Sequence, residues 1–435
     1  MRSAHQKNTV RFYLIIIAFL SFLFFSSDFG LIDVQKTAIV MAVGVDREDD
    51  AFIVTSQIAV PQSSKQGSST ETVQIVSRGK TVADAFEEIN EKTGWYPKLV
   101  FCKLIILGEK TAQQNVFDAL DFFLLDEYLT DNCLLATCDG TAKDLLNVTA
   151  LVDSSGSVAM QKVLSSHAER VGTVMPSTLR EFSIGYYGSS KYGFLPVLKT
   201  QQQQEKIGKE ESSNQGGSSG QNQGGSNGSS GSSGNSSGGS GGQSGSSGSG
   251  GKSDSSGGQG GQPSEKPVFN ASETALFVNG KRVDTLTEAQ TFALSAVKSD
   301  LRLASYSVPM ENNQTCTLTI KRNDKKNQFK VGKDGRAVLK VQVKLTSGFL
   351  DYSKALPLDQ TRDVGDVPSG AFAAAEKLLS AQITSVFEKC RACGCDLFEL
   401  RDSLQKYAFN RYEELKDTVL ENALLDISVR FQSVR

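Results

Sequence analysis

Histidine is almost absent from this chain, which has 435 residues but only two imidazoles, at His5 and His167. Histidine is the side chain that most often titrates near neutral pH, and it is the commonest metal ligand. Its scarcity argues against an enzyme that uses imidazole chemistry and against a zinc protein. We therefore predict no enzyme activity and no catalytic, cofactor-binding or metal-binding residues.

An excess of positive charge is also missing, because 46 Lys and Arg residues face 48 Asp and Glu residues, for a formal net charge of -2. Proteins that bind DNA or RNA usually carry a basic surface that attracts the phosphate backbone. Nucleic acid is thus a poor candidate partner. The hydrophobic content of 39% is that of an ordinary globular protein, so a sizeable core is expected.

The first 101 residues contain no cysteine, and all seven cysteines of the chain follow from Cys102 on. Their number is odd and no spacing suggests a full disulfide framework, so at least one thiol should stay unpaired in the monomer. This usage fits a reducing or anaerobic setting better than a strongly oxidising one. A lipid-modified cysteine near the N-terminus is not expected.

The N-terminus carries an export or anchoring signal. Three basic residues, Arg2, Lys7 and Arg11, precede the segment from Phe12 to Phe25, which is apolar apart from Ser21. Acidic residues follow it, so the positive-inside rule places the N-terminus in the cytoplasm and the rest of the chain outside. The folded body is therefore expected to be extracytoplasmic.

Cleavage of this signal is a separate question. The segment would span roughly 21 Å as a helix, which is shorter than a hydrocarbon core of about 30 Å and typical of a signal peptide. However, no small-x-small cleavage site follows it, and extension through Phe29 to Leu31 supplies part of the missing length. We favour an uncleaved anchor helix, with a cleaved signal peptide as the alternative.

A low-complexity tract divides the chain. From Gln201 to about Pro263 the residues are almost wholly Gln, Gly, Ser and Asn, without one aromatic. Such a segment cannot build a core and is predicted to be disordered. Because the entropy of closing a loop grows only slowly with its length, the tract could be a linker or an insertion in one surface loop.

The part before the tract mixes strands and helices. An amphipathic helix is predicted from Thr81, a good N-cap, to Lys92, and Gly94 suits its C-cap. A second helix is predicted at Asn115–Leu125. Strands are predicted at Thr37–Val45, Phe52–Val60, Thr72–Ser77, Leu99–Leu107 and Asn132–Cys138, the first two joined by a turn at Asp46–Asp50.

The part after the tract opens with a hairpin, since Asn279-Gly280 is the strongest short hairpin signal. It is followed by a helix at Thr287–Leu294 and by strands with period-two alternation. These strands are predicted at Thr315–Lys321, Gln328–Val331 and Ala337–Leu345, followed by helices at about Ala371–Ala392 and Leu397–Leu415 and a last strand at Leu424–Val434. The predicted fold class is α+β, with the last helices packed on a twisted antiparallel sheet.

Cys390-x-x-Cys393-x-Cys395 is the one constellation that suggests a metal or redox site. Cys390 and Cys393 share a helical stripe with Leu379, Ile383 and Val386, and a free cysteine packs as a small apolar side chain. Zinc would require a fourth ligand, and the second half of the chain has no histidine. Core packing is favoured, and a local disulfide is the main alternative.

The remaining candidates are weaker. His167 is not accompanied by a nucleophile motif, so a surface histidine is expected. The acidic run Asp46–Asp50 lacks the glycine and terminal glutamate of a calcium loop, so a solvated hairpin turn is expected. Phosphate-loop patterns in the Gly-rich tract do not follow a strand or open a helix, and we regard them as chance matches.

Several segments, taken in order, resemble the Ger(x)C family, the C subunits of spore germinant receptors. Thr37–Asp46 is similar to the family's first strand, which ends in Gly-hydrophobic-Asp, and Lys103–Glu109 to a following strand. Thr81–Gly94 resembles its first helix. Phe194–Val197 and Ala275–Leu286 resemble two paired strands that are normally close in sequence. Cys395–Leu400 resembles the start of a C-terminal helix, with an Asp-hydrophobic-Phe motif.

The resemblance implies three domains outside the membrane. They would be an N-terminal domain at 32–185, a middle domain at 186–305 that is interrupted by the disordered insertion 201–266, and a C-terminal domain at 306–435, all preceded by the anchor region 1–31. Family members typically carry a lipidated cysteine before the first strand. This chain has none between Asp28 and Gln35, and the apolar segment would replace it.

The function that the resemblance implies is that of a membrane-tethered, non-enzymatic subunit of a spore germinant receptor. It would act by contacts with the A-type and B-type membrane subunits, on the extracytoplasmic face of the spore inner membrane. The rival hypothesis is an envelope display or adhesion protein, in which the Gly/Ser tract is a spacer for a ligand-binding domain.

Overall fold

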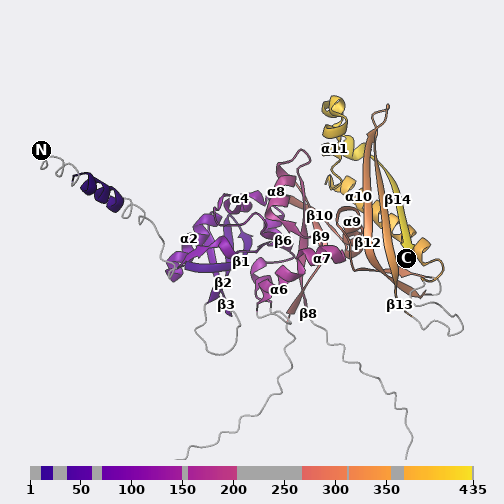
Figure 1. The fold of residues 1–435 in the computed structure, drawn as a ribbon. Coiled ribbons are helices and arrows are strands. Elements are labelled where there is room, and N and C mark those ends of the chain that lie inside the picture. Colours follow the sequence, from indigo (N-terminus) through magenta and orange to yellow (C-terminus); the bar gives the residue numbers. More distant parts are fainter. Residues whose placement is uncertain are drawn as a thin grey trace, which may run out of the picture. The chain divides into compact units, whose positions relative to one another are not determined.

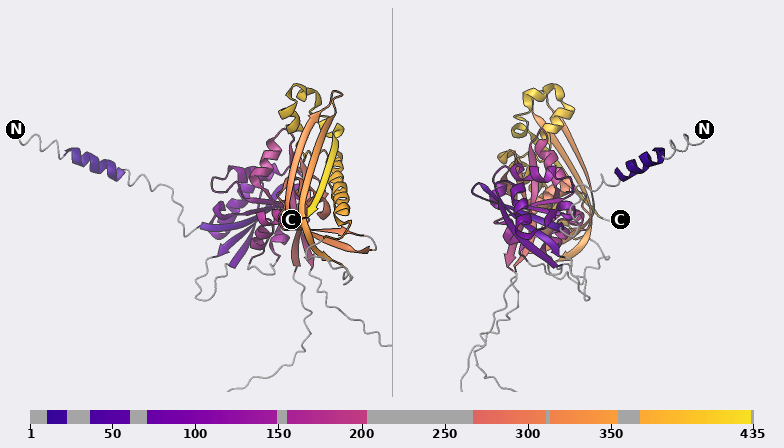
Figure 2. Two further views of the ribbon diagram at one scale, coloured as in Figure 1. Left: turned by 45° about the vertical axis from the view of Figure 1, so that its right-hand side comes forward. Right: turned by 90° about the vertical axis from the view of Figure 1, so that its left-hand side faces the viewer.

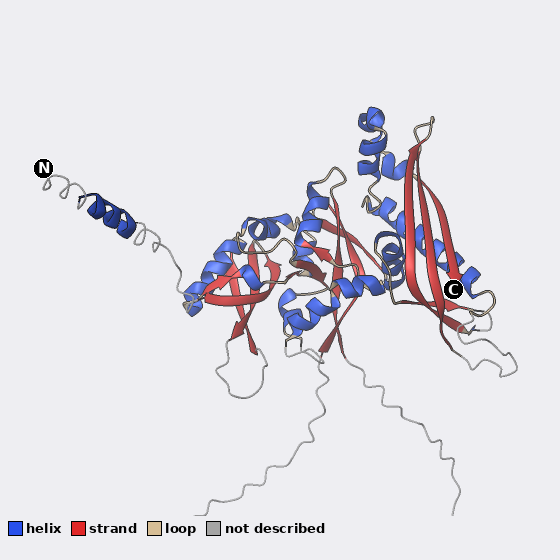
Figure 3. Ribbon diagram, in the orientation of Figure 1, coloured by secondary structure: helices blue, strands red, loops and turns tan. Residues whose placement is uncertain are grey.

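The computed structural model describes residues 11–22, 37–60, 71–148, 155–202, 267–310, 313–353 and 367–433 (Figure 1). Within these ranges the chain is a mixture of helices and two β-sheets, as the α+β prediction requires (Figure 3). His5 and residues 203–266, which include almost all of the Gly/Ser tract, lie outside the described residues.

The first sheet is ten-stranded, with the order β10-β9-β8-β6-β5-β1-β2-β3, while β4 pairs with β1 and β7 with β6. Its strands are β1 (Thr37–Glu48), β2 (Ala51–Val60), β3 (Glu71–Gly79), β4 (Tyr96–Lys98), β5 (Leu104–Leu107), β6 (Leu134–Cys138), β7 (Ser177–Thr178), β8 (Tyr192–Gln202), β9 (Pro267–Val278) and β10 (Lys281–Leu286). The centre of the sheet is parallel, because β5 runs parallel to both β1 and β6.

Helices cover both faces of this sheet. They are α2 (Val82–Thr93), η2 (Leu99–Phe101), α3 (Glu109–Ala112), α4 (Phe117–Leu125), α5 (Ala142–Leu146), α6 (Gly156–Val163), α7 (Ser166–Val171) and α8 (Leu179–Tyr187). Because both faces of the sheet are covered, β5 has apolar residues on both of its faces. Ile105 and Leu107 belong to the core that includes α2 and α4, whereas Leu104 and Ile106 belong to the core that includes α5. A short run that is apolar throughout is typical of such a doubly covered strand.

The first predicted helix forms as its sequence signals indicate. In α2 the Thr81 side chain accepts from the Asp84 backbone N–H, the Asp84 carboxylate accepts from the Thr81 N–H, and Gly94 ends the helix in the left-handed conformation, with φ of 70°. The expected strand Leu99–Leu107 is only partly right. Its first residues form η2, and only Leu104–Leu107 pair with β1.

The second sheet has the order β11-β12-β13-β14, with β11 (Ala304–Pro309), β12 (Thr315–Val331), β13 (Ala337–Tyr352) and β14 (Leu424–Ser433). Its long strands run side by side (Figure 2). The expectation of an antiparallel sheet is wrong for one pair, because β14 runs parallel to β13. A parallel pair needs a crossover of a dozen or more residues, and the chain between these strands supplies it.

The crossover contains α10 (Ala371–Cys393), α11 (Leu400–Tyr407), η4 (Phe409–Arg411), α12 (Tyr412–Leu415) and α13 (Val419–Asn422). α10 packs against β14 and also against α9 (Glu288–Lys298). One hydrophobic core includes Leu276 and Leu286 of the first sheet, Phe292 of α9 and Val341 of the second sheet. α9 begins with a capping box between Thr287 and Gln290, and it runs to Lys298, beyond the predicted end at Leu294.

The strands on either side of the Gly/Ser tract are neighbours. β8 and β9 pair antiparallel as far as Gln202 and Pro267, and β9 continues into β10 through Asn279-Gly280, both with positive φ. Residues 203–266 therefore join the adjacent ends of one antiparallel pair, which is the arrangement expected of an insertion in a loop.

Deletion of residues 214–262 tests this arrangement. The shortened loop still joins Gln202 to Pro267. A shorter loop has a smaller entropic cost of closure, so we expect the free energy of unfolding to rise by about 1 kcal/mol. Calorimetry should show one cooperative transition at nearly the original melting temperature. Loss of the cooperative transition in the deletion variant would contradict the insertion.

Residues 11–22 form a helix whose large apolar side chains, among them Phe12, Ile15 and Phe22, are exposed. Within the described ranges, no helix combines the length and the apolar character needed to cross a membrane. The predicted anchor also includes residues 23–25 and its extension to Leu31, which lie outside these ranges. An uncleaved membrane anchor stays a prediction.

Candidate functional site

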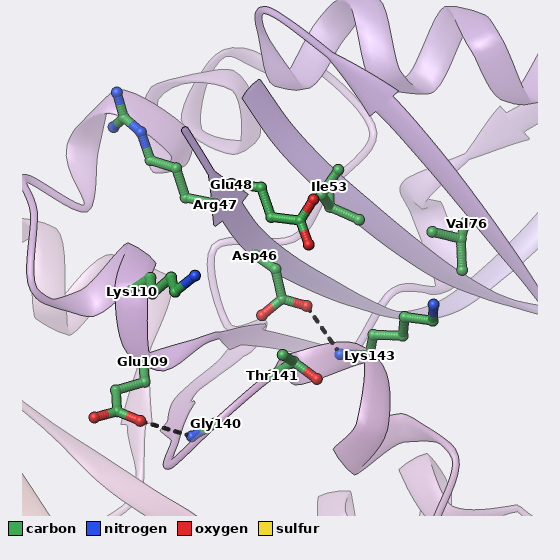
Figure 4. Close-up of a pocket in the computed structure, with 10 residues that line it drawn as sticks. All are labelled: Asp46, Arg47, Glu48, Ile53, Val76, Glu109, Lys110, Gly140, Thr141 and Lys143. Carbon is green, nitrogen blue, oxygen red and sulfur yellow. Dashed lines mark hydrogen bonds between the residues drawn. The ribbon is translucent and has the colours of Figure 1, made fainter. Parts of the chain in front are cut away.

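A cleft lies at the carboxyl end of the parallel strands in the first sheet. Ligands of open α/β sheets bind in the crevice outside the carboxyl ends of the strands. The cleft has a volume of about 330 Å³ (Figure 4). Its lining comes from the end of β1, from β2 and β3, from α3 after β5, and from the turn after β6 with the start of α5. The lining residues are Asp46, Arg47, Glu48, Ile53, Val76, Glu109, Lys110, Gly140, Thr141 and Lys143.

Asp46 forms the floor of this cleft. Its side chain is 8% exposed, and its two oxygens accept hydrogen bonds from the backbone N–H groups of Ala142 at 2.8 Å and Lys143 at 3.0 Å. These groups belong to the first turn of α5, where helix N–H groups lack partners in the helix. A residue of β1 thus holds the start of a helix that lies 96 positions later in the sequence.

Burial raises the pKa of the Asp46 carboxyl, while the two N–H donors of α5 act in the opposite direction. The expectation that Asp46–Asp50 is a solvated turn is wrong for Asp46, because this residue lies in β1 and points into the protein. Glu48, Asp49 and Asp50 are exposed, and the tight turn occurs at Asp49, whose φ is 51°.

Glu109 makes a second connection to the same turn. Its backbone N–H donates to the Gly140 carbonyl at 2.9 Å, and its carboxylate accepts from the Gly140 N–H at 3.0 Å. Gly140 has φ of 88°, a conformation that favours glycine. The two strand ends that carry the family-like motifs, at Asp46 and Glu109, therefore hold one turn between them (Figure 4).

The chemistry that this cleft can perform is limited by these bonds. The carboxylates of Asp46 and Glu109 accept backbone N–H groups, and Arg47 pairs with Asp118 at 3.3 Å outside the lining. The lining contains no cysteine, serine or histidine. We interpret the cleft as a structural junction, whose lining also includes Lys110 and Lys143.

Sequence reasoning missed the turn at Gly140–Lys143 and the helix α5. A local signal was present, because Thr141 and Asp144 have the spacing of a capping pair, and the Thr141 hydroxyl accepts from the Asp144 N–H at 3.1 Å. The connection to Asp46 had no signal, since it joins distant parts of the sequence.

The three clustered cysteines lie at the end of α10 and just after it. All are free thiols; Cys390 and Cys395 are buried, and Cys393 is half-buried. The prediction of core packing is confirmed for Cys390, which lies on the buried face of α10 with Leu379, Ile383 and Val386. Within the described residues, no group of three or more His, Cys, Asp or Glu side chains could hold a metal ion.

Cys393 differs from its neighbours in acidity. A hydrogen bond with Cys395 lowers the pKa of the Cys393 thiol to about 7, while the same bond and burial raise that of Cys395. Burial also raises the pKa of Cys390. Because the thiolate is the nucleophile, we expect iodoacetamide to modify Cys393 before the other two in the native protein near pH 7.

Peptide mass spectrometry of the alkylated protein measures this order. Below pH 7 the rate at Cys393 should fall about tenfold per pH unit, as the thiolate is protonated. In Cys395→Ala the hydrogen-bond partner of Cys393 is removed, and alkylation of Cys393 at neutral pH should be slower. Equal alkylation rates at all three cysteines of the native protein would show that Cys393 is not activated.

His167, another candidate from the sequence, lies in the short helix α7.

Comparison with known proteins gives two family matches. Residues 31–200 match the model described as "Spore germination protein N-terminal domain", and residues 272–434 match "Spore germination B3/ GerAC like, C-terminal". Between them the two matched ranges leave out the N-terminal apolar segment and the Gly/Ser tract.

Two curated relatives from Bacillus subtilis (strain 168) are similar to parts of the chain. Spore germination protein B3 is 29% identical over 119 residues, which cover 26% of this chain and 31% of the relative. Spore germination protein A3 is 26% identical over 177 residues, which cover 39% of this chain and 46% of the relative. The chain thus spans less than half of the length of either relative.

A solved structure, the crystal structure of the GerBC protein, can be superposed with a TM-score of 0.48 and a sequence identity of 14%. The superposition covers 90% of this chain and 97% of that one.

Proposed function

Because this chain belongs to the family of GerAC-like spore germination proteins, we propose that it is the C-type subunit of a spore germinant receptor. The observation that carries the proposal is that the two family models match residues 31–200 and 272–434 in the expected order. The names of both curated relatives also refer to spore germination.

We further propose that the apolar segment Phe12–Phe25 tethers the folded body to the membrane. Basic residues precede this segment, and residues 11–22 form a helix with exposed apolar side chains. The body would lie on the extracytoplasmic side by the positive-inside rule. In a spore this side would be the outer face of the inner membrane.

The protein would act by contacts with the A-type and B-type membrane subunits, without catalysis. We retain the division into domains at 32–185, 186–305 and 306–435 as part of this proposal. The narrow connection in the first sheet supports the boundary before β8, since β8 pairs with β6 only at Val197 and Leu198.

Fractionation of spores of the native organism tests the tether. We expect the protein in the inner-membrane fraction, with tryptic peptides from upstream of Asp28 in mass spectra. A mature N-terminus after Ser27 would contradict the anchor, although the protein could still be a receptor subunit. Recovery from the soluble fraction alone would contradict membrane association.

A further inference from the structure

Exposed aromatic and apolar side chains gather at the end of the first sheet opposite the Asp46 cleft. Trp95 and Tyr96 lie after α2, Val100 and Phe101 lie in η2, and Tyr128 follows α4. Trp95 is 42% exposed and Phe101 53% exposed. The Lys98 ammonium lies 4.1 Å from the centre of the Tyr128 ring, so the segment after α4 contacts β4. We call the five exposed residues, without Lys98, the aromatic patch.

The patch continues into an apolar groove of about 200 Å³. Its lining is apolar apart from one threonine and consists of Ala38, Ile58, Ala59, Val73, Ile75, Thr93 and Trp95. Trp95 belongs to both the groove and the patch. Contiguous apolar surface of this kind is unusual on a soluble protein and marks a site of interaction with a protein or a membrane.

The aromatic patch lies beside the point where the chain enters the folded body. β1 begins at Thr37, which is paired with Tyr96 of β4, and the next residue, Ala38, lines the groove. Residues 23–36 join this point to the apolar helix at 11–22, and even a fully extended chain of that length covers at most roughly 50 Å. A bilayer that holds the apolar segment is therefore within reach of the patch.

The composition of the patch fits the surface of a bilayer. Trp and Tyr combine an apolar ring with a polar group, and they are enriched at the level of lipid headgroups. Phe101 and Val100 can enter the acyl region, while the cationic side chains of Lys98 and the exposed Lys103 remain near phosphates. The acidic cleft residue Asp46 lies at the other end of β1.

We propose that the aromatic patch docks on the lipid bilayer and so fixes the orientation of the folded body on the membrane. Its rings would lie at the headgroup level, with the carboxyl end of β1 directed away from the lipid. The inference rests on the membrane tether of the proposed function, because one apolar segment alone would leave the body free to rotate.

Trp95 provides a direct probe, since it is the single tryptophan of the chain. The full-length protein is reconstituted into vesicles of equimolar phosphatidylcholine and phosphatidylglycerol, with phosphatidylcholine brominated at defined acyl positions. We expect the emission of Trp95 to shift to shorter wavelength. Bromines near the glycerol should quench it more than bromines near the bilayer centre.

Variants separate docking from tethering. Val100→Asp combined with Phe101→Asp places two charges on the patch, and should lower the ratio of docked to undocked protein by at least roughly tenfold. Quenching should be largely lost, although the apolar segment still keeps the protein on the vesicles. Phe409→Asp changes an aromatic that is 74% exposed beside the second sheet, and should leave the quenching unchanged.

Three results would overturn the proposal. Vesicle-bound protein with unquenched, long-wavelength Trp95 emission would show that the patch faces water, without affecting the tether. Blue-shifted emission that brominated lipid does not quench would show that a protein segment covers the patch. Failure of the protein to sediment with vesicles would contradict both the tether and the docking.

Discussion

Replacement of Asp46 by alanine is expected to lower the free energy of unfolding by about 3 kcal/mol or more. The carboxylate is buried and accepts two backbone hydrogen bonds, and hydrogen bonds to a charged group contribute roughly 1.5–3 kcal/mol each when a buried donor would otherwise lose its partner. Asp46→Asn keeps one oxygen acceptor and should cost about half as much. Denaturant unfolding followed by circular dichroism measures both variants.

Gly108 gives a sharper test of the same junction. A Cβ atom at this position would overlap Oδ1 of Asp46, which α5 holds in place, so Gly108→Ala should also be strongly destabilising. In the Asp46→Ala background the overlap is gone, and the same substitution should cost much less. Additive effects in this double-mutant cycle would show that the two residues do not act on each other.

Asp396→Ala is the second substitution with a large expected effect, again a loss of about 3 kcal/mol or more. The Asp396 side chain is fully buried and accepts from the N–H groups of Leu400 at 2.8 Å and Arg401 at 2.9 Å, at the start of α11. Asp396 also accepts a hydrogen bond at 2.9 Å from the hydroxyl of Ser190, which lies just before β8. This bond links the first sheet to the C-terminal helices.

Ser190→Ala is the matched control, because it removes one neutral donor and leaves the two N–H groups of α11 paired. It should cost about 1.5 kcal/mol, which is half of the loss expected for Asp396→Ala or less. If both variants were destabilised equally in denaturant unfolding, the capping of α11 by Asp396 would contribute nothing measurable. In that case only the hydroxyl contact to the first sheet would matter.

Local signals in the sequence predicted much of the fold. The helix from Val82 begins and ends at the residues that its caps indicate, and the Asn279-Gly280 turn forms the expected hairpin. These features depend on residues within a few positions of one another, so a single sequence carries the necessary information.

The errors occur where distant contacts decide the conformation. One helix was expected at Leu397–Leu415, but the chain breaks after Tyr407. After the break, the Arg411 guanidinium donates a hydrogen bond to the Gly332 carbonyl at 3.0 Å. The Arg401 guanidinium donates to the Lys416 carbonyl, also at 3.0 Å. The apolar spacing continues through the break and could not indicate it.

In the candidate site, too, the local elements were predicted and the contacts between distant residues were not. The resemblance pointed to Asp46 and Glu109 as ends of family-like strands, and both strands form, but their common partner at Gly140–Lys143 was not predicted. The sequence also grouped Cys390, Cys393 and Cys395 correctly. It could not show that the sulfur of Cys395 lies 3.5 Å from the carbonyl oxygen of Phe277 in β9.

Purification of the tagged protein from detergent-solubilised spore membranes tests the proposed function most directly. We predict that the A-type and B-type membrane subunits of one receptor co-purify with it in constant proportion, and that their recovery falls when the tagged chain is absent. A protein that is recovered from spore membranes alone, without these subunits under any mild solubilisation, would contradict its assignment as a receptor subunit.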